Sequence, residues 1–320
     1  MQINHPKKYF SSKSQLVANQ ELFKAASTTY YYSSLFFTPK IREAVSAFYA
    51  FVRTVDDFVD TTPQQIVKFV AFVEAYNRMY AGENYHQVQT QVWSHSQVDA
   101  QLTDRDFEVI TAMILLQDTF GIKKIIIDSF LKAMEADIYK KTYISLEETV
   151  VYMYGSADVI GICMAKILDL PDSALEAAKL QGRAMQYINF IRDVLEDTTL
   201  GRQYLPATQL KKFGLRDLSK EECSQKPEQF SEFLRAQIDL YFIWQEEAER
   251  GYDFIPYRYR VPIITAAHMY RWTAKQIAKN PALVFEKKIK PTKSLVVAFG
   301  LWTCFSQLPI VRSICTFQNN

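Results

Sequence analysis

The sequence predicts an all-α protein built as one large domain. Long stretches repeat apolar residues at the 3.6-residue period of a helix, and only 9 of the 320 residues are glycine. Most prolines fall at the ends of these stretches or between them. Hydrophobic residues make up 48% of the chain, which is enough for a substantial core. No stretch reads as a linker between domains, so we expect a single helical bundle.

Local start and stop signals divide this bundle into helices. Pro39 suits the first turn of a helix, and Ser145 opens a Ser-x-x-Glu capping box. Gly201 and Pro206 end the longest helix. Residues 82–102 are weakly patterned and are predicted mostly as a loop. The predicted helices are 15–26, 40–60, 63–81, 103–118, 122–140, 146–169, 173–199, 227–252 and 258–280, with a flexible segment over 1–14, a short helix after Pro206 and a polar connection over 214–226.

Composition narrows the class of protein. The formal net charge is +2 and no Lys/Arg run stands out, which argues against a nucleic-acid partner. The four cysteines show neither metal-ligand nor disulfide spacing, as is typical of a reducing cytosol. The first residues lead into no apolar segment of a signal peptide. We therefore expect a cytoplasmic protein.

The C-terminal tail, residues 294–320, allows three interpretations. Its apolar part is about long enough to cross a bilayer, but it contains Gln307, Pro309 and Arg312. The favoured interpretation is a terminal helix packed on the bundle. A contact with the membrane surface comes second, and a full transmembrane span is the least favoured.

A buried acidic helix is predicted over residues 183–206. Gln186, Asn189, Asp193 and Asp197 fall on one helical face, while most other positions are apolar. Glu196 borders this polar stripe. Because isolated buried carboxylates are costly to ionise, the arrangement calls for bound cations.

A second acidic stripe lies in the predicted helix 40–60. Tyr49, Arg53, Asp56 and Asp60 share one face, with Asp57 beside it. Carboxylates one turn apart can hold a hard divalent cation, and Mg²⁺ completes its octahedron with water and phosphate oxygens. Two such motifs predict several Mg²⁺ ions, or Mn²⁺ in their place, clamped on a diphosphate.

The arginines near the acids allow two interpretations. Arg53 and Arg192 could form structural salt bridges with the neighbouring aspartates. Alternatively, they and Arg202 could contact phosphate oxygens through the planar guanidinium fork. Both interpretations of the arginines stay open. A single D-x-x-x-D motif is usually a solvated helix face, but two of them on apolar helices, both accompanied by Arg, favour a functional site.

These motifs together resemble the squalene/phytoene synthase family over roughly residues 20–293. The most specific part is the second acidic motif with its Arg-Gln-Tyr-Leu-Pro extension. The matching segments are Asp56-Asp-Phe-Val-Asp60, Asn189-Phe-Ile-Arg-Asp-Val-Leu-Glu-Asp197, Gly201-Arg-Gln-Tyr-Leu-Pro206, the hydroxyl- and aromatic-rich run 27–34, and the central segments 134–137 and 152–161.

The resemblance implies an isoprenoid-synthase helical bundle over residues 15–293, with the two acidic motifs facing each other across a central cavity. It implies head-to-head condensation of two prenyl diphosphates. Where the family often has a histidine before the 27–34 run, this chain has Ala26, so a proton relay through that histidine has no counterpart. The resemblance implies these metal ligands: Asp56, Asp57, Asp60, Asn189, Asp193, Glu196 and Asp197. It implies substrate contacts by Arg53, Arg192, Arg202, Gln186, Asn189, Tyr32 and Tyr270. The implied catalytic residues are Tyr49, Tyr204 and the four principal aspartates, which are Asp56, Asp60, Asp193 and Asp197.

Several functions remain open within and outside this family. The Tyr-Gly-Ser-Ala-Asp-Val-Ile-Gly segment favours a phytoene synthase-like enzyme acting on geranylgeranyl diphosphate. The alternative is an enzyme that uses farnesyl diphosphate to make dehydrosqualene or, with NADPH, squalene. A non-catalytic scaffold protein is disfavoured because the four principal aspartates are present, as is a helical bundle with fortuitous acids. We expect a monomer or weak dimer, and the apolar product suggests peripheral membrane association.

Overall fold

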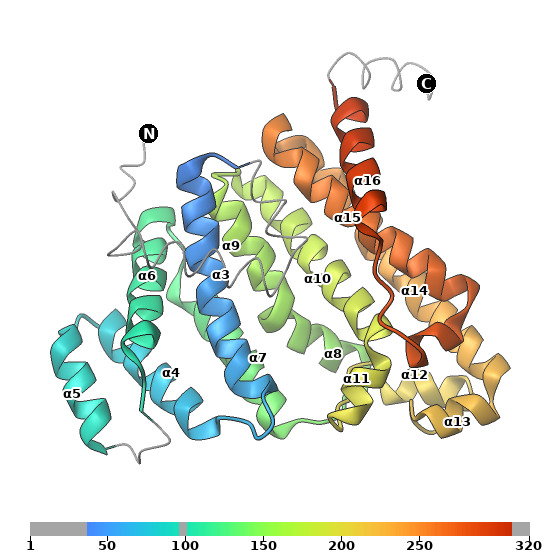
Figure 1. Ribbon diagram of the computed structural model, residues 1–320, viewed down its shortest axis with the longest axis horizontal. Helices are drawn as coiled ribbons and strands as arrows, with labels where there is room; N and C mark the ends of the chain where they lie inside the picture. Colours follow the sequence, from blue (N-terminus) through green and yellow to red (C-terminus); the bar gives the residue numbers. More distant parts are fainter. Residues whose placement is uncertain (1–36, 96–100, 309–320) are drawn as a thin grey trace. The chain divides into compact units, whose positions relative to one another are not determined.

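The computed structural model describes residues 37–95 and 101–308, and they form helices joined by short connections (Figure 1). No β-strand lies within these two ranges; Thr142 and Gln203 form an isolated β-bridge. The all-α prediction is therefore confirmed for the described chain. The described residues form two compact units, one of residues 37–95, 101–139 and 166–169, the other of residues 140–165 and 170–308.

The first unit surrounds α3, which carries the first acidic motif. Thr38 caps α3 and Pro39 occupies its first turn, as predicted. Phe51 is buried on the helix and lies 5.7 Å from Phe72 and 6.2 Å from Phe130, measured between ring centroids. This apolar contact directs the polar stripe of α3 away from the core. Among the described residues, the helices of this unit are α3 (Pro39–Asp60), α4 (Ile66–Tyr80), α5 (Tyr85–His95), α6 (Asp104–Phe120) and α7 (Lys124–Tyr139).

The prediction of a loop over residues 82–102 was wrong for α5. Its side chains are largely polar, so the sequence shows little periodicity. Val88 is nevertheless fully buried, and the Tyr85 ring meets Phe107 edge-on at 5.4 Å between centroids. Contacts with another helix, rather than local pattern, stabilise this element.

The predicted start of the helix 63–81 was also wrong. The helix α4 begins at Ile66, and Pro63 lies in the preceding bend. The backbone N–H of Gln65 donates to the carbonyl of Phe58 at 2.8 Å, which ties the bend to the end of α3. This hydrogen bond holds Pro63 within the bend, so α4 starts after the proline and not at it.

The second unit is built around α10, which packs most extensively on α14. The acids of the second motif follow the C-terminal end of α10, at Asp193 and in α11; Figure 1 shows α11 continuing from α10. Its elements are α8 (Leu146–Met153), the π-helix η2 (Tyr154–Asp158), α9 (Val159–Ile167, of which the last two residues belong to the first unit), η3 (Asp172–Ala174), α10 (Leu175–Arg192), α11 (Val194–Thr199), α12 (Ala207–Lys212), α13 (Lys220–Gln225), α14 (Pro227–Glu249), η4 (Arg250–Phe254), α15 (Tyr257–Lys279), η5 (Pro281–Phe285) and α16 (Lys293–Ser306).

The predicted single helix 173–199 is divided in the structure. Asp193 adopts φ −99° and ψ 20°, so α10 ends at Arg192 and α11 follows directly. The backbone N–H of Asp193 still donates to Asn189 at 2.8 Å, and that of Asp197 to Asp193 at 2.9 Å. The helical direction is therefore maintained, but the acids do not share one ideal helical face.

Two glycines allow η2 and α9 to approach α10 closely. A Cβ atom on Gly182 would lie 2.3 Å from the carbonyl oxygen of Ala157, and one on Gly161 would lie 2.0 Å from that of Ala178. Such distances exclude any side chain without movement of the backbone. These backbone contacts set the position of α10 within the second unit.

A buried ion pair lies at the same interface. Asp158, fully buried in η2, accepts a hydrogen bond from Nε of Arg183 on α10 at 3.2 Å and forms an ion pair with it. The Arg183 guanidinium also lies 5.7 Å from the Trp244 ring centroid of α14. The guanidinium thus connects three elements of the second unit.

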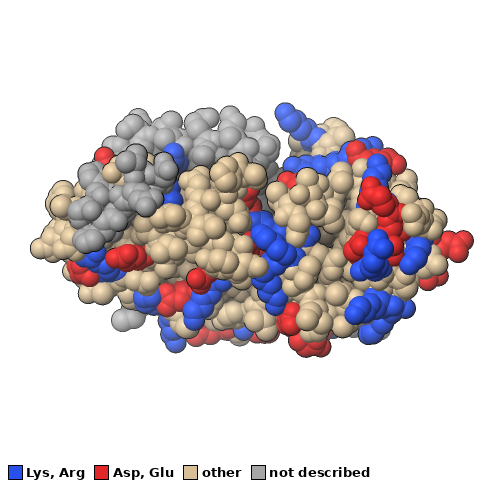
Figure 2. All heavy atoms as spheres, turned by 90° about the horizontal axis from the view of Figure 1, so that it is seen from below, with Lys and Arg blue, Asp and Glu red and all other residues tan. Residues whose placement is uncertain are grey.

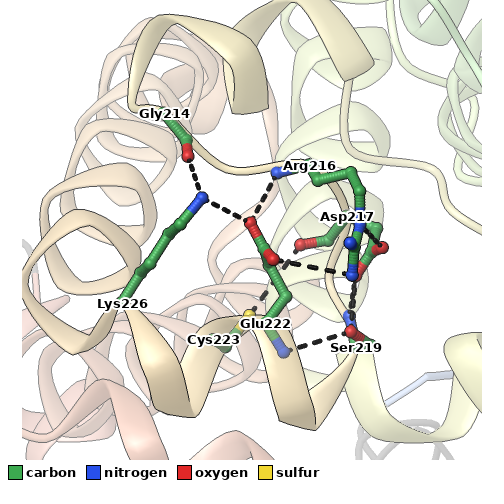
Figure 3. A network of polar contacts seen from close by, with 7 residues as sticks. All are labelled: Gly214, Arg216, Asp217, Ser219, Glu222, Cys223 and Lys226. Atoms are coloured by element: carbon green, nitrogen blue, oxygen red, sulfur yellow. Dashed lines mark hydrogen bonds and ion pairs between the residues drawn. The ribbon is translucent and has the colours of Figure 1, made fainter.

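The polar connection over 214–226 folds into an ordered network that contains α13 (Figure 3). Glu222, which is buried, accepts hydrogen bonds from the backbone N–H of Arg216 at 2.9 Å and from Nζ of Lys226 at 2.8 Å. Lys226 also donates to the carbonyl of Gly214 at 2.8 Å. These bonds compensate the buried carboxylate and join α12 to α14.

A second polar network connects α10, α14 and α15. Gln245 is fully buried, and its amide donates to Gln181 at 3.3 Å, to Tyr252 at 3.1 Å and to Glu249 at 3.1 Å. Glu249 in turn accepts a hydrogen bond from Nε of Arg271 at 2.8 Å. A satisfied network of this kind favours one register between the three helices.

One helical run in the described chain, Leu146–Ile167, is long and apolar enough to cross a membrane by length and composition. Of its most apolar window, 56% is buried inside the structure, as in the core helix of a soluble protein.

On the face drawn in Figure 2, Lys and Arg side chains lie interspersed with Asp and Glu side chains.

Candidate active site

The first acidic motif lies on the α3 face opposite the aromatic core. The guanidinium of Arg53 lies 3.2 Å from the carboxylate of Asp56, and it also forms an ion pair with Asp57. Asp60, one turn further, is exposed. The structure thus places Arg53 against two acids of its own helix, as the salt-bridge interpretation expected.

Asp56 is the most perturbed carboxyl group of this motif. Burial and the neighbouring charge of Asp60 raise its pKa to about 7, although Arg53 acts in the opposite direction. Asp137 of α7, which is buried, contributes further repulsion. A nearby cation would stabilise the ionised form of a carboxyl group whose pKa is raised in this way.

The other two predicted residues of α3 belong to the same electrostatic group. Burial raises the pKa of Tyr49, an effect that Arg53 reduces. For Arg53, burial opposes the charged form, but Asp56 and Asp57 outweigh it and the pKa is raised. Asp137 was not predicted as a site residue, although it lies in the family-matching segment 134–137; its burial beside α3 identifies it.

The second acidic motif carries its own cations. Arg192 donates two parallel hydrogen bonds to Asp193, from Nε at 2.8 Å and from Nη2 at 2.5 Å. Nζ of Lys288 lies 3.5 Å from Asp193 and 2.5 Å from Glu196. Asp193 is therefore held between two positive charges.

The sequence pattern did not point to Lys288 and Lys290, because they follow η5, far along the chain from the motif. Burial and the nearby charges of Lys288 and Arg192 lower the pKa of Lys290. The lysines and Arg192 thus form a compact basic group beside Asp193. The run Lys287-Lys-Ile-Lys290 was the available signal, but its position relative to the motif depends on tertiary structure.

Asn189 provides an oxygen atom without a hydrogen-bond partner. Its Oδ1 is buried one turn before Asp193 and accepts no hydrogen bond. An unsatisfied buried acceptor is costly, so this atom is suited to a ligand or cation. Gln186, one turn earlier on α10, is partly buried.

Arg202 and Tyr204 follow α11 and are buried. The backbone N–H of Arg202 donates to the carbonyl of Asp197 at 2.7 Å, which brings this arginine back to the motif. The Tyr204 ring stacks on Phe190 at 4.4 Å between centroids and also on Tyr152 at 5.2 Å. Tyr204 is thus part of a rigid aromatic stack of the second unit.

Tyr270 of α15 lies close enough to Arg192 to influence its pKa. Burial opposes the charge of Arg192, but Asp193 and then Tyr270 favour it, and the pKa is raised. The polar network that ends in Glu249 and Arg271 orients this part of α15. The structure therefore brings Arg192, Asp193, Glu196 and Tyr270 together in the second unit.

Tyr32 and the 27–34 run lie outside the described residues. Within the described residues, no three His, Cys, Asp or Glu side chains form a complete metal-ligand group. The donor atoms nevertheless suit a hard cation: carboxylate oxygens, the unsatisfied Asn189 Oδ1, and the Asp56 carboxyl group with its raised pKa. Mg²⁺ commonly takes one or two carboxylates and leaves the remaining positions to water and phosphate. Metal binding stays a prediction.

Comparison with known proteins tests the resemblance. The profile of the squalene/phytoene synthase family matches residues 23–294. The chain belongs to this family, whose members are prenyltransferases.

Similar curated sequences include phytoene synthases. The chloroplastic enzyme of an Oncidium hybrid cultivar is 27% identical over 85% of this chain, and this chain covers 64% of that protein's length. The 15-cis-phytoene synthase of Enterobacter agglomerans is 25% identical over 80% of this chain and 83% of its own length. The chain thus spans slightly less than two thirds of the orchid relative.

Solved structures support the fold. A dehydrosqualene synthase solved with a ligand superposes with a TM-score of 0.71 and 21% identity, covering 91% of this chain and 95% of its own. A squalene synthase from Alicyclobacillus acidocaldarius gives a TM-score of 0.65 at 21% identity, covering 87% and 96%. The predicted isoprenoid-synthase fold is confirmed.

Proposed function

We propose that this protein catalyses the Mg²⁺-dependent head-to-head condensation of two geranylgeranyl diphosphates to phytoene, through a cyclopropyl (prephytoene) diphosphate. Its sequence similarity to phytoene synthases supports this choice of substrate. The observation that carries the proposal is the group of cations beside Asp193, where Arg192 and Lys288 contact an acidic motif next to the unsatisfied Asn189.

The reaction loses one diphosphate and one proton in each of its two halves. In the first, the allylic C–O bond of one substrate breaks and the double bond of the other forms the cyclopropane. In the second, the remaining diphosphate leaves, the ring carbons rearrange and the product alkene forms. Bound Mg²⁺ would neutralise the leaving diphosphate, with Asp56, Asp60, Asp193 and Asp197 as its principal carboxylate ligands.

The basic residues of the second unit are suited to the phosphate oxygens. Arg192 offers a planar fork and Lys288 a point charge, and both are already oriented by Asp193. Binding of a diphosphate would exchange these intramolecular contacts for phosphate contacts. Arg202 and Lys290 add positive charge in the same unit, and Arg53 has this role on α3.

The aromatic stack contributes shielding from water. Tyr204, Phe190 and Tyr152 are buried and their rings stack on one another, so this aromatic stack is rigid. A carbocation needs a water-excluding surround, and ring faces stabilise positive charge. Released diphosphate or a nearby tyrosine would accept the proton, because Ala26 stands where other family members often have a histidine.

Product analysis tests the proposal. Purified protein is incubated with Mg²⁺ and either geranylgeranyl or farnesyl diphosphate, with and without NADPH, and the hydrocarbon is identified by mass spectrometry. Phytoene from the twenty-carbon substrate is expected. Dehydrosqualene or squalene from the fifteen-carbon substrate alone would establish the alternative, and no hydrocarbon from either would contradict the enzymatic function.

A further inference from the structure

A tyrosine in the core of the second unit carries a hydroxyl group without a hydrogen-bond partner. Tyr241 of α14 is fully buried, and within the described residues its hydroxyl neither donates nor accepts a hydrogen bond. An unpaired hydroxyl in a protein core is destabilising, and native proteins contain few of them. Phenylalanine would fill the same space without this cost. The hydroxyl of Tyr241 therefore calls for a role other than stabilising the fold.

A second buried tyrosine of this unit shows the ordinary arrangement. Tyr187 of α10 is also fully buried, but its hydroxyl donates to Oε1 of Gln237 on α14 at 2.6 Å. Its ring meets Trp244 edge-on, with 5.0 Å between the ring centroids. The two tyrosines are thus equally buried and differ in whether the hydroxyl is paired.

The register of α10 and α14 shows which way the Tyr241 side chain leans. In the first half of α10, Nε2 of Gln181 donates to Oε1 of Gln245 at 3.1 Å. In its second half, Tyr187 bonds Gln237, so the two helices run antiparallel. Tyr241 lies one turn from both glutamines on the same face of α14. Because helical side chains lean toward the N-terminus of their own helix, Tyr241 leans toward the C-terminal end of α10.

The helix α15 brings polar groups to the same place. Nε of Arg271 donates to Glu249 at 2.8 Å, and the Arg271 guanidinium lies 5.5 Å from the ring centroid of Phe242, the residue after Tyr241. Burial raises the pKa of the Tyr241 hydroxyl, and Arg271 acts in the opposite direction. Glu249 and Tyr270 raise this pKa further. Tyr270, which precedes Arg271 on α15, is therefore a neighbour of the unpaired hydroxyl.

Tyr270 also connects this group to the second acidic motif. It lies near Arg192, whose charged form it favours, so the pKa of Arg192 is raised further. Arg192 donates two hydrogen bonds to Asp193, and in the proposed function phosphate oxygens replace that carboxylate. Tyr270 is thus a neighbour both of the unpaired Tyr241 hydroxyl and of the guanidinium that exchanges partners.

We propose that Tyr241 is a positioning residue of the diphosphate site and acts through Tyr270. When a diphosphate engages Arg192, the Tyr241 hydroxyl donates to the Tyr270 oxygen, and the Tyr270 hydroxyl donates to a phosphate oxygen. The first hydrogen bond polarises the second, so the pair binds the anion more strongly than Tyr270 alone. The free protein carries the cost of the unpaired hydroxyl, and binding removes it. This inference rests on the proposed function, because it concerns the same diphosphate site.

Calorimetric titration of the full-length protein with inorganic diphosphate and Mg²⁺ tests the proposal. Tyr241→Phe should weaken the affinity about tenfold, as expected for the loss of one hydrogen bond that supports an anion contact. The same variant should raise the Tm of the metal-free protein by about 1–3 °C, because it removes an unpaired buried hydroxyl. A purely structural role of the hydroxyl would lower the Tm instead.

Tyr187→Phe is the matched control, because it removes the paired hydroxyl of an equally buried tyrosine. It should lower the Tm, since Gln237 loses a hydrogen bond, and it should bind diphosphate like wild type. A double-mutant cycle then tests the route through Tyr270. The effects of Tyr241→Phe and Tyr270→Phe on the affinity should not add, because each breaks the same chain of hydrogen bonds.

Three results would overturn the assignment. The first is wild-type affinity of Tyr241→Phe for diphosphate. The second is a Tm of Tyr241→Phe lowered as much as that of Tyr187→Phe, because the hydroxyl would then be paired in the free protein. The third is additive effects of Tyr241→Phe and Tyr270→Phe. If wild-type protein binds no diphosphate, the proposed function fails together with this inference, whereas normal wild-type binding with an unaffected Tyr241→Phe variant contradicts this inference alone.

Discussion

The two acidic motifs differ in how their charge is compensated. On α3, Arg53 is shared between Asp56 and Asp57, and repulsion from Asp60 and Asp137 remains strong enough to raise the Asp56 pKa. At the end of α10, Asp193 receives two hydrogen bonds from Arg192 and a further contact from Lys288. The first motif has an excess of acid, and the second is neutralised by the protein itself.

This difference suggests different tasks for the two motifs. A motif with excess acid is stabilised by cations, so α3 is the stronger candidate for holding metal in the absence of substrate. A motif whose cations are already in place can exchange them for phosphate oxygens, so the α10–α11 region is the stronger candidate for diphosphate recognition. Both conclusions are hypotheses, and the following experiments test them.

The largest expected effect is on turnover. Asp56→Ala and Asp193→Ala should each reduce hydrocarbon formation by about a thousandfold or more, because each removes a proposed metal ligand worth several kcal/mol in the transition state. The helical circular dichroism spectrum should remain nearly unchanged. Near-normal turnover of either variant would contradict the metal-clamp assignment.

The next effect concerns how α10 is positioned. Gly182→Ala should lower the free energy of unfolding by about 1–3 kcal/mol, because the new Cβ would lie 2.3 Å from the Ala157 carbonyl oxygen. Gly300→Ala on α16 is the matched control, since its Cβ meets no atom within 4 Å. Chemical denaturation measures both; equal stability of the two variants would show that the close approach is unimportant.

Replacing an aspartate by asparagine should affect the stability of the metal-free protein differently in the two motifs. Asp193→Asn should destabilise the fold by about 1–2 kcal/mol, because Arg192 and Lys288 lose their charged partner. Asp56→Asn should leave stability unchanged or increased, because it removes a repelled carboxylate. Thermal unfolding gives the comparison, and a larger loss for Asp56→Asn would reverse the proposed division of tasks.

Inorganic diphosphate should report the cations of the second motif. Lys288→Met should weaken its binding about tenfold, which corresponds to one charge-assisted contact. Lys293→Met is the control, because Lys293 is exposed at the start of α16. Calorimetric titration in the presence of Mg²⁺ measures both affinities; equal weakening by the two substitutions would indicate only a general charge effect.

The last prediction concerns the pH dependence of stability without metal. The Asp56 pKa is about 7 in the folded protein against an ordinary value of 3.8, so the folded state binds more protons between these values. Stability should therefore fall as the pH rises from about 4 to about 7. Comparison of thermal unfolding for wild type and Asp56→Asn across this range isolates the contribution, and identical slopes would exclude Asp56 as its origin.

Much of the fold followed from local patterns. The α3 helix was predicted from Pro39 and its apolar period, and the first acidic motif lies on it as expected. The α5 helix was missed because its order depends on Val88 and Tyr85 packing against other helices. The interruption at Asp193 was also missed, since a change of one backbone conformation leaves no mark on hydrophobic periodicity.

The sequence by itself determined the family, the helical class and the residue types of the two acidic motifs, because these depend on short-range spacing. Only the tertiary structure decided that Lys288 contacts Asp193 and Glu196. It also decided that α16 packs on α15 while Leu301, Trp302 and Phe305 stay exposed. The physical reason is the separation along the chain between the residues that interact. Periodicity reflects neighbours within a few turns, whereas the contact of Lys288 with Asp193 exists only once distant helices have packed.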